Sequence, residues 1–235
     1  MSEGSEAAKP RSDLGIRTAS GVAMMVVTAG AIWLGGYAFT IFVAIIGIGL
    51  LREWQLLVIA ITGSYLQRVA WTLGGILYIG TAAALMAILR DTGQTDALLA
   101  FIGVVIATDT GAYFTGRTFG GPKIAPRISP SKTWSGLAGG MTSSGLFLAS
   151  FAYYSQGQIW PWAFIIGAQL AAMAQAGDFF ESWIKRRAGV KDSGNFIPGH
   201  GGLFDRLDGL LPVVIIGTFG IMFASWTTGR LAALT

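Results

Sequence analysis

Seven apolar segments, separated by short polar ones, constrain the fold of this chain more than any other feature. About 20 apolar residues of α-helix cross the hydrocarbon core of a bilayer. Lipid offers unpaired backbone groups no hydrogen-bond partner, so such segments must be helical. Because 53% of the 235 residues are hydrophobic and only 12% are charged, we predict an all-α integral membrane protein, a polytopic bundle of transmembrane helices. The predicted spans are Thr18–Leu34, Tyr37–Leu51, Leu73–Leu89, Asp96–Gly116, Thr133–Tyr154, Trp160–Gly177 and Gly209–Trp226.

The basic residues predict how these spans are oriented. Lys and Arg concentrate in cytoplasmic loops. A cytoplasmic N-terminus places all 16 of them on that side except Arg90 and Arg230. Gln55–Leu66 is apolar but short, and it fits a half-helix, an interfacial segment or part of a tilted span. An eighth crossing there would disturb the charge asymmetry, so we predict seven spans.

The same reasoning divides the chain into two parts. Residues 1–17 are predicted to be a disordered cytoplasmic tail, and residues 18–235 a single polytopic catalytic domain. Tryptophans near the predicted span ends, Trp54 among them, are expected at the membrane interface. The chain has no cysteine, which excludes disulfides and thiolate metal sites.

The ionisable residues gather in one polar stretch, Ser182–Asp208. It holds five of the 16 basic residues, three of the 12 acidic ones and the only histidine. Asp205 and Asp208 within it are spaced i, i+3 at the start of the last predicted span. Around the start of the polar stretch, four residues are spaced i, i+3, i+4 and i+7 and therefore share one helix face: Asp178, Glu181, Ser182 and Lys185.

Carboxylates beside several cations suit a polyphosphate bound with divalent metal ions, because oxygen ligands hold the metal and the cations hold the phosphates. The alternative is an ordinary solvated basic loop on the cytoplasmic side. His200 lacks a His or Cys companion, so a zinc site is not expected. We expect it to contact phosphate or to order the glycine-rich loop.

Two features upstream also point to a site. Asp109 follows an almost wholly apolar run, and an acid within a membrane span is expected to be functional. Tyr113 shares its helix face, and the alternative for Asp109 is a structural partner such as Arg117. Ile128–Thr133 precedes a predicted helix, so its Ser, Thr and Lys residues fit a phosphate seat, or else ordinary helix capping.

These segments resemble the phosphatidate cytidylyltransferase (CDP-diacylglycerol synthase) family. Its signature reads S-x-x-K-R, K-D, H-G-G and D-R-x-D, and all four blocks occur in order within Ser182–Asp208. The region from Asp109 to Gly140 is similar to a second characteristic region, with D-x-x-A-Y, G-R, S-P-x-K-T and G-G in place. The departures are Ser131 and Ser135, where many members carry Lys and Glu, and Gly209, where Ser is frequent.

The resemblance implies an all-helical fold, a homodimer, and the reaction of CTP with phosphatidate to give CDP-diacylglycerol and pyrophosphate. It implies Mg²⁺ and a second cation, with K⁺ as a candidate, held by acids matching Asp178, Asp205 and Asp208. The site is expected from residues 109–136 and 178–208. Catalytic roles are implied for Asp178, Lys185, Arg186, Lys191, Asp192, His200, Asp205, Arg206 and Asp208. Substrate-binding roles are implied for Asp109, Tyr113, Arg117, Ser129, Ser131, Lys132, Thr133, Ser182, Gly201 and Gly202.

The chemistry of the residues agrees with this reaction. The phosphate of phosphatidate is already ionised, so it needs charge neutralisation rather than a general base. The expected partners are CTP, phosphatidate, membrane lipid and a second copy of the chain, with no nucleic acid. The expected location is a bacterial inner membrane, with the site facing the cytoplasm. The alternatives are another CTP-dependent lipid phosphate cytidylyltransferase or a polyprenol kinase of the same superfamily, and more remotely a cation transporter.

Overall fold

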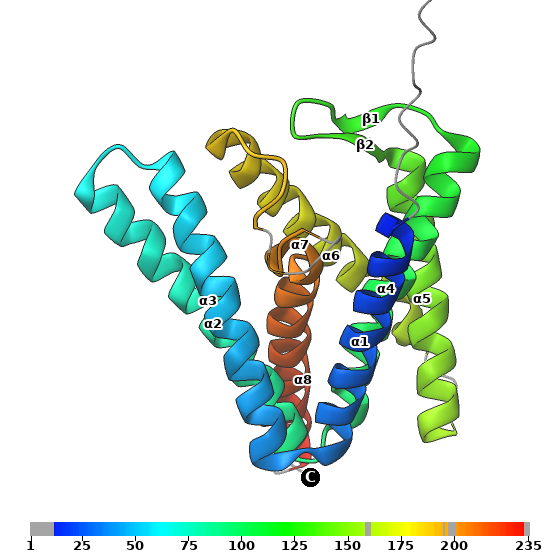
Figure 1. Ribbon diagram of the computed structural model, residues 1–235. Coiled ribbons are helices and arrows are strands. Elements are labelled where there is room, and N and C mark those ends of the chain that lie inside the picture. The colour runs from blue at the N-terminus through cyan, green and yellow to red at the C-terminus, as the bar shows by residue number, and fades with distance from the viewer. Residues whose placement is uncertain (1–11, 158–160, 195, 197–200, 233–235) are drawn as a thin grey trace, which may run out of the picture.

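The fold is built from long helices that run back and forth between two ends of the molecule (Figure 1). The computed structural model describes residues 12–157, 161–194, 196 and 201–232. The long helices are α1 (Ser12–Leu34), α2 (Gly36–Ile61), α3 (Tyr65–Asp91), α4 (Thr95–Phe119), α5 (Trp134–Gln156), α6 (Pro161–Ala188) and α8 (Leu210–Ala232). The short elements are strands β1 (Lys123–Ala125) and β2 (Ser129–Thr133) and the single-turn helix α7 (Phe204–Leu207).

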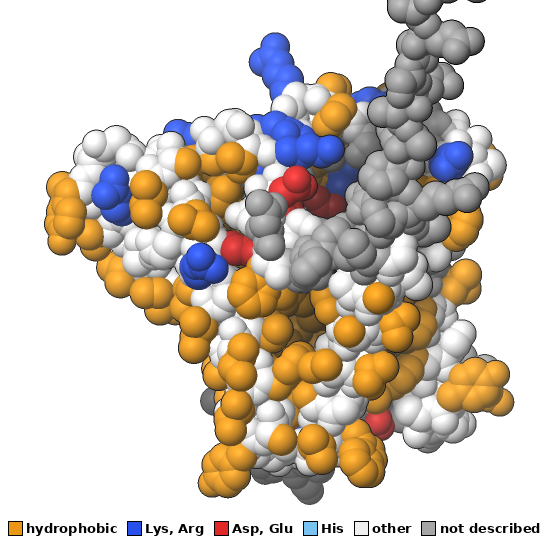
Figure 2. Space-filling view, in the orientation of Figure 1, with side chains coloured by type: hydrophobic (Ala, Val, Ile, Leu, Met, Phe, Trp, Pro, Cys, Tyr) orange, Lys and Arg blue, Asp and Glu red, His pale blue; other side chains and the backbone are white. Residues whose placement is uncertain are grey.

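Each predicted span corresponds to one long helix, which confirms the all-α architecture. Within the described part of the chain, α2, α3, α4, α6 and α8 are long and apolar enough to cross a membrane, and Thr18–Leu34 of α1 is a shorter apolar segment. Hydrophobic side chains cover the lower part of the face shown in Figure 2, while acidic and basic side chains gather near its top. This distribution is that of an integral membrane protein.

The N-terminal boundary differs from the prediction. Helix α1 begins at Ser12, so residues 12–17 of the predicted tail are helical, and residues 1–11 lie outside the described residues. The start of α1 lies at the same end of the molecule as β1–β2 and α7, whereas the C-terminal end of the chain lies at the opposite end (Figure 1).

The segment Gln55–Leu66 is not a separate crossing. Helix α2 continues past Arg52 to Ile61, and α3 begins at Tyr65, so the segment forms the tip of an α2–α3 hairpin that extends away from the other helices (Figure 1). Trp54 therefore lies inside the fold, 2% exposed, and its Nε1 donates to the carbonyl of Trp71 at 2.8 Å. The prediction of an interfacial Trp54 was wrong because the helix does not end there.

The basic loop after α4 forms a β-hairpin that the sequence did not predict. Strands β1 and β2 pair antiparallel, with Lys123 opposite Thr133 and Ala125 opposite Ser129. At the end of β2, the Thr133 hydroxyl accepts a hydrogen bond from the Gly136 N–H at 3.1 Å and caps α5. The hairpin thus leads directly into α5, and the Thr133 cap fixes where that helix begins.

Small residues allow close helix packing at two places. Helices α4 and α5 approach each other so closely that a methyl group on Gly140 would lie 3.0 Å from the carbonyl oxygen of Thr108. On α6, a methyl group on Gly177 would overlap the carbonyl of Asp208 and lie 2.7 Å from Pro212. The second contact brings the start of α8 against the polar end of α6.

Candidate active site

Three carboxylates converge where α6 meets the chain between α7 and α8. Asp178 and Glu181 come from the same face of α6, and Asp208 follows α7. One carboxylate oxygen from each residue lies within 4.8 Å of the others. We call these residues the carboxylate cluster. The close approach at Gly177 explains the convergence, because it seats the Asp208 backbone directly against α6.

Burial affects the protonation of the cluster. Burial, followed by the charge of Asp178, raises the pKa of the Asp208 carboxyl to about 7. The hydrogen bond that its Oδ1 accepts from the Gly209 N–H, at 2.7 Å, opposes this rise. Near neutral pH, Asp208 therefore exchanges its proton readily, and a cation can displace that proton.

The donor set suits a hard divalent cation. All three side chains offer oxygen, which Mg²⁺ prefers. The Oε1 atom of Glu181 is buried and has no hydrogen-bond partner among the described residues. A buried carboxylate oxygen without a partner is costly, and a bound cation would satisfy it. The residues therefore fit a metal ion, although the sequence proposed Asp205 in the place of Glu181.

Asp205 lies beside the cluster but its oxygens are already occupied. Its Oδ1 contacts Lys185 Nζ at 2.5 Å, and its Oδ2 accepts hydrogen bonds at 2.9 Å from the backbone N–H groups of Ser193 and Gly202. Burial alone would raise the pKa of Asp205, but hydrogen bonds with Glu181, Lys185 and the Ser193 backbone outweigh it and lower the pKa to about 2. Asp205 is thus a permanently charged anchor of the loop.

Lys185 joins the two groups of acids. Its Nζ lies 2.7 Å from Glu181 Oε2 as well as 2.5 Å from Asp205, and its side chain is 12% exposed. It holds Glu181 and Asp205 together with two charge-assisted contacts. Its position favours a role in fixing the acids rather than in reaching a substrate.

The β-hairpin supplies the second lysine of the site. Lys132 of β2 forms an ion pair with Asp178 and donates to Gln175 Oε1 at 2.8 Å. Its ammonium also lies 4.9 Å from the centre of the Phe179 ring. Lys132 and Asp178, with side chains 16% and 33% exposed, are the more accessible parts of the site. The predicted proximity of residues 109–136 to residues 178–208 is visible in this contact.

The other predicted residues lie at different distances from the cluster. The charge of Asp109 acts on Asp208, which places it near the cluster. Tyr113 and Arg117 are exposed and bind each other, with Nη1 to Oη at 2.7 Å. Arg186 Nε donates to the carbonyl of Ile128 at 3.3 Å and ties α6 to the hairpin.

Several predicted residues lie around the rim or have other partners. The Thr133 hydroxyl caps α5, Ser129 is buried, and the Ser182 hydroxyl donates to Asp178 Oδ1 at 3.4 Å. Gly201 adopts a left-handed φ of 82°, and the Gly202 N–H binds Asp205. Exposed positions of the predicted set are Ser131, Lys191, Asp192 and Arg206. His200 lies outside the described residues.

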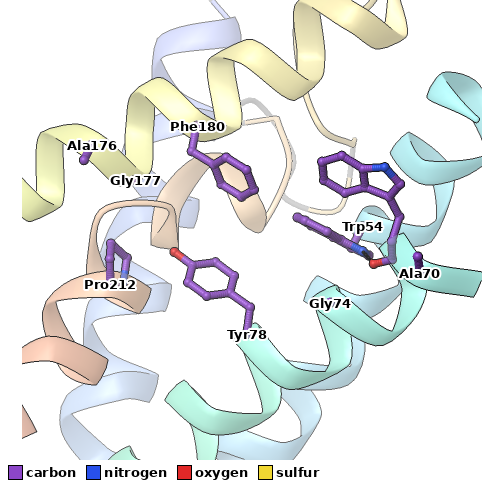
Figure 3. Close-up of a pocket in the computed structure, with 9 residues that line it drawn as sticks. Trp54, Ala70, Gly74, Tyr78, Ala176, Gly177, Phe180 and Pro212 are labelled. Atoms are coloured by element: carbon purple, nitrogen blue, oxygen red, sulfur yellow. Dashed lines mark hydrogen bonds between the residues drawn. The ribbon is translucent and has the colours of Figure 1, made fainter. Parts of the chain in front are cut away.

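An aromatic groove adjoins the cluster on its apolar side. About 540 Å³ in volume, it lies between the α2–α3 hairpin and helices α6 and α8, and it is lined by Trp54, Ala70, Trp71, Gly74, Tyr78, Ala176, Gly177, Phe180 and Pro212. Tyr78 and Phe180 face each other across it with ring centres 6.2 Å apart (Figure 3). Gly177 lines the groove and also packs against the Asp208 backbone, so the groove reaches the carboxylate cluster at this residue.

Sequence reasoning gave no site role to three polar residues of the site. Glu181 was placed on the same helix face as Asp178, but it was not assigned as a metal ligand. Gln175 lies one turn before Asp178 on α6. Glu53 of α2 carried no signal, because nothing in the sequence connects it with a loop 140 residues further on.

Comparison with known proteins places this arrangement in a family. Residues 55–224 match the profile of the Cytidylyltransferase family. The phosphatidate cytidylyltransferase of Brucella suis is 33% identical over 91% of this chain and 95% of the relative. That of Rickettsia felis is 36% identical over 87% and 90% of the two chains. That of Rickettsia bellii is 37% identical over 86% and 88%.

Proposed function

Because the chain belongs to the cytidylyltransferase family, we propose that it transfers the cytidylyl group of CTP to phosphatidate. A phosphate oxygen of phosphatidate forms a bond to the α-phosphorus of CTP, and the bond from that phosphorus to the bridging β-phosphate oxygen breaks. CDP-diacylglycerol forms and pyrophosphate leaves. The observation that carries this proposal is a carboxylate cluster that adjoins both a lysine-bearing hairpin and an apolar groove.

Asp178, Glu181 and Asp208 would hold Mg²⁺ in this proposal. Bound there, the metal would neutralise phosphate charge and stabilise the leaving pyrophosphate. Asp205, which the sequence also nominated, keeps Lys185 and the loop in place. A second cation such as K⁺ remains a prediction from the family resemblance.

The cations of the chain divide into two roles. Lys185 is held between Glu181 and Asp205 and fixes their positions. Lys132 has an accessible ammonium at the opening of the site, where it exchanges its contact with Asp178 for a phosphate oxygen when CTP binds. The exposed Lys191 and Arg206 raise the positive potential around the opening and draw the triphosphate in.

The lipid substrate enters from the bilayer side. Its acyl chains lie along the aromatic groove, so its phosphate reaches the cluster at Gly177 without leaving the membrane. The apolar lining of the groove supports this placement, because a ligand with an apolar part gains from burial there. The site faces the cytoplasm in this proposal, where CTP is available, and two copies of the chain associate in a bacterial inner membrane.

The test is direct. Purified protein is incubated with CTP labelled at the α-phosphorus, Mg²⁺ and phosphatidate, and label is counted in the chloroform-soluble fraction. Label in lipid together with an equal amount of pyrophosphate is expected. Label transferred only to another lipid phosphate would identify a different acceptor. In a parallel reaction with CTP labelled at the γ-phosphorus, transfer of that label to lipid would identify a kinase, and cation flux without any transfer would identify a transporter.

A further inference from the structure

Glu53 is a buried acid that the proposed chemistry does not use. It lies on α2, two residues before the segment that matches the family, and it is 4% exposed. Its Oε1 accepts from the Leu203 N–H at 2.9 Å and its Oε2 from the Phe204 N–H at 2.8 Å. The hydroxyl of Ser193 lies 3.0 Å from Oε2. Neutral donors, from one distant loop, thus hold the carboxylate.

Glu53 contacts both ends of that loop. Gly194 follows Ser193 at the beginning of the loop, and a methyl group there would lie 2.5 Å from Glu53 Oε1. Gly202 precedes Leu203 at the other end, and a methyl group there would lie 2.7 Å from Glu53 Oε2. Both glycines leave room for the carboxylate. Glycine at positions 194 and 202 therefore has a physical reason that lies on another helix.

Two short connections lead from Glu53 to the acids of the site. The Ser193 hydroxyl lies 3.0 Å from Glu53 and also 3.0 Å from Asp205 Oδ2, so it connects the two carboxylates. On the other side, the Asp208 N–H donates to the Phe204 carbonyl at 3.0 Å. The N–H of the same Phe204 is held by Glu53. A displacement of Phe204 therefore moves Asp208.

We propose that Glu53 is a positioning residue that holds the two described ends of this loop, Ser193–Gly194 and Gly202–Phe204, together and thereby places Asp205 and Asp208 opposite α6. This inference rests on the proposed function, in which Asp208 belongs to the metal-binding cluster. Glu53 acts through the loop and touches no substrate. The carboxylate is suited to this task because each of its oxygens accepts a backbone N–H, which an amide side chain does with only one of its two terminal atoms.

The test compares two substitutions on α2. Glu53→Gln keeps the size of the side chain but turns one N–H-accepting oxygen into a donor. Leu57→Ala, one helical turn further on and 3% exposed, is the control for a general loss of stability. Amide hydrogen exchange at Leu203 and Phe204 is measured on the metal-free, detergent-solubilised proteins. The Mg²⁺ concentration for half-maximal activity, kcat and thermal midpoint are measured alongside.

Glu53→Gln is expected to speed amide exchange at Leu203 and Phe204 at least tenfold, to raise the half-saturating Mg²⁺ concentration about tenfold and to lower kcat. Leu57→Ala is expected to lower the thermal midpoint while leaving the Mg²⁺ dependence unchanged. Glu53→Asp, which keeps the charge, should recover part of the Mg²⁺ affinity. Equal Mg²⁺ dependence in Glu53→Gln and Leu57→Ala overturns the proposal.

Two further measurements keep the outcome interpretable. If Glu53→Gln does not fold, Ser193→Ala removes only the connecting hydroxyl and should raise the half-saturating Mg²⁺ concentration in the same direction. An unchanged Mg²⁺ dependence in Ser193→Ala would then refute the connection. Wild-type protein that forms no CDP-diacylglycerol refutes the proposed function instead, while the exchange rates at Leu203 and Phe204 still test whether Glu53 holds the loop.

Discussion

At the scale of single residues, neighbouring acids of the site have different tasks. Asp178 is one-third exposed and has an accessible partner in Lys132, whereas Asp205 is nearly enclosed and is held by Lys185 and the loop backbone. An exposed carboxylate with a replaceable partner suits ligand exchange. An enclosed one with fixed partners suits structure.

This difference predicts different consequences for the same chemical change. Asp178→Asn should lower cytidylyl transfer by about two orders of magnitude or more while the protein keeps its thermal midpoint. Asp205→Asn should lower transfer and also destabilise the fold by roughly 1.5–3 kcal/mol, because charged hydrogen bonds to Lys185 and the loop are weakened. Thermal unfolding in detergent and the labelled-CTP assay measure both effects. Asp91→Asn, at the exposed end of α3, is the control, and equal loss of stability in the two site variants would contradict the division.

The raised pKa of Asp208 predicts how metal binding depends on pH. Only the deprotonated carboxylate binds a cation, so below the pKa of about 7 each proton must be displaced first. The affinity for Mg²⁺ should therefore rise about tenfold per pH unit up to about pH 7. Calorimetric titration of metal-free protein between about pH 5.5 and 8.5 measures this. A flat affinity across that range would show that Asp208 is ionised throughout or is no ligand.

At the scale of elements, the β-hairpin brings Lys132 to the acids of α6. Lys132→Ala removes the ammonium that contacts Asp178, and it should lower kcat/KM for CTP by about one to two orders of magnitude. Lys123→Ala is the matched control, because Lys123 lies on β1 and its Nζ donates to the Ser131 carbonyl at 3.4 Å rather than to an acid among the described residues. Equal kinetics in the two variants would leave the hairpin without a role in binding CTP.

The groove between the α2–α3 hairpin and α6 makes a separate prediction for the lipid. A side chain at Gly74 or at Gly80 of α3 meets open space, but only Gly74 lines the groove. Gly74→Phe should therefore raise the KM for phosphatidate several-fold with little change in the KM for CTP, whereas Gly80→Phe should change neither. Mixed-micelle kinetics with each substrate varied in turn measure this. A shift in the KM for CTP alone would place the lipid elsewhere.

Local patterns predicted the helices and the shared face of α6, because helix periodicity depends only on nearby residues. The spacing from Asp178 to Lys185 was sufficient to place those side chains together. The β-hairpin and the buried Trp54 were not predictable in the same way. The hairpin depends on pairing across a loop that contains Pro126. The burial of Trp54 depends on α2 continuing through Arg52 and Glu53, which look like the end of a span.

The sequence also could not show which of the acids form the carboxylate cluster. Asp205 and Asp208 have the spacing of a shared face, but α7 is a single turn, and the chain between it and α8 directs the two carboxylates to different neighbours. Glu181 enters the cluster because Gly177 lets Asp208 approach α6. That approach depends on how two distant segments pack together, and no local sequence pattern predicts it.

At the scale of the whole molecule, the long helices place the first and the last described helix ends on opposite sides. The start of α1 lies with the site, and the end of α8 lies at the far end (Figure 1). With seven crossings and a cytoplasmic site, alkaline phosphatase fused after Thr235 should be active in a bacterial host, and a fluorescent protein fused there should be dark. A fluorescent protein fused before Met1 should be bright. The reverse pattern would invert the orientation, and matching signals at both ends would require an even number of crossings.

The contact between Glu53 and its loop also has a consequence for biosynthesis. The partners of Glu53 lie 140 to 151 residues later in the chain. At a translation rate of about 5–20 residues per second, they leave the ribosome on the order of ten seconds after Glu53 does. During that interval α2 carries an acid without its donors, which favours contact with water over burial. A truncated chain that ends before Ser193 never supplies these donors, so Glu53 on its second helix stays without hydrogen-bond partners from the loop.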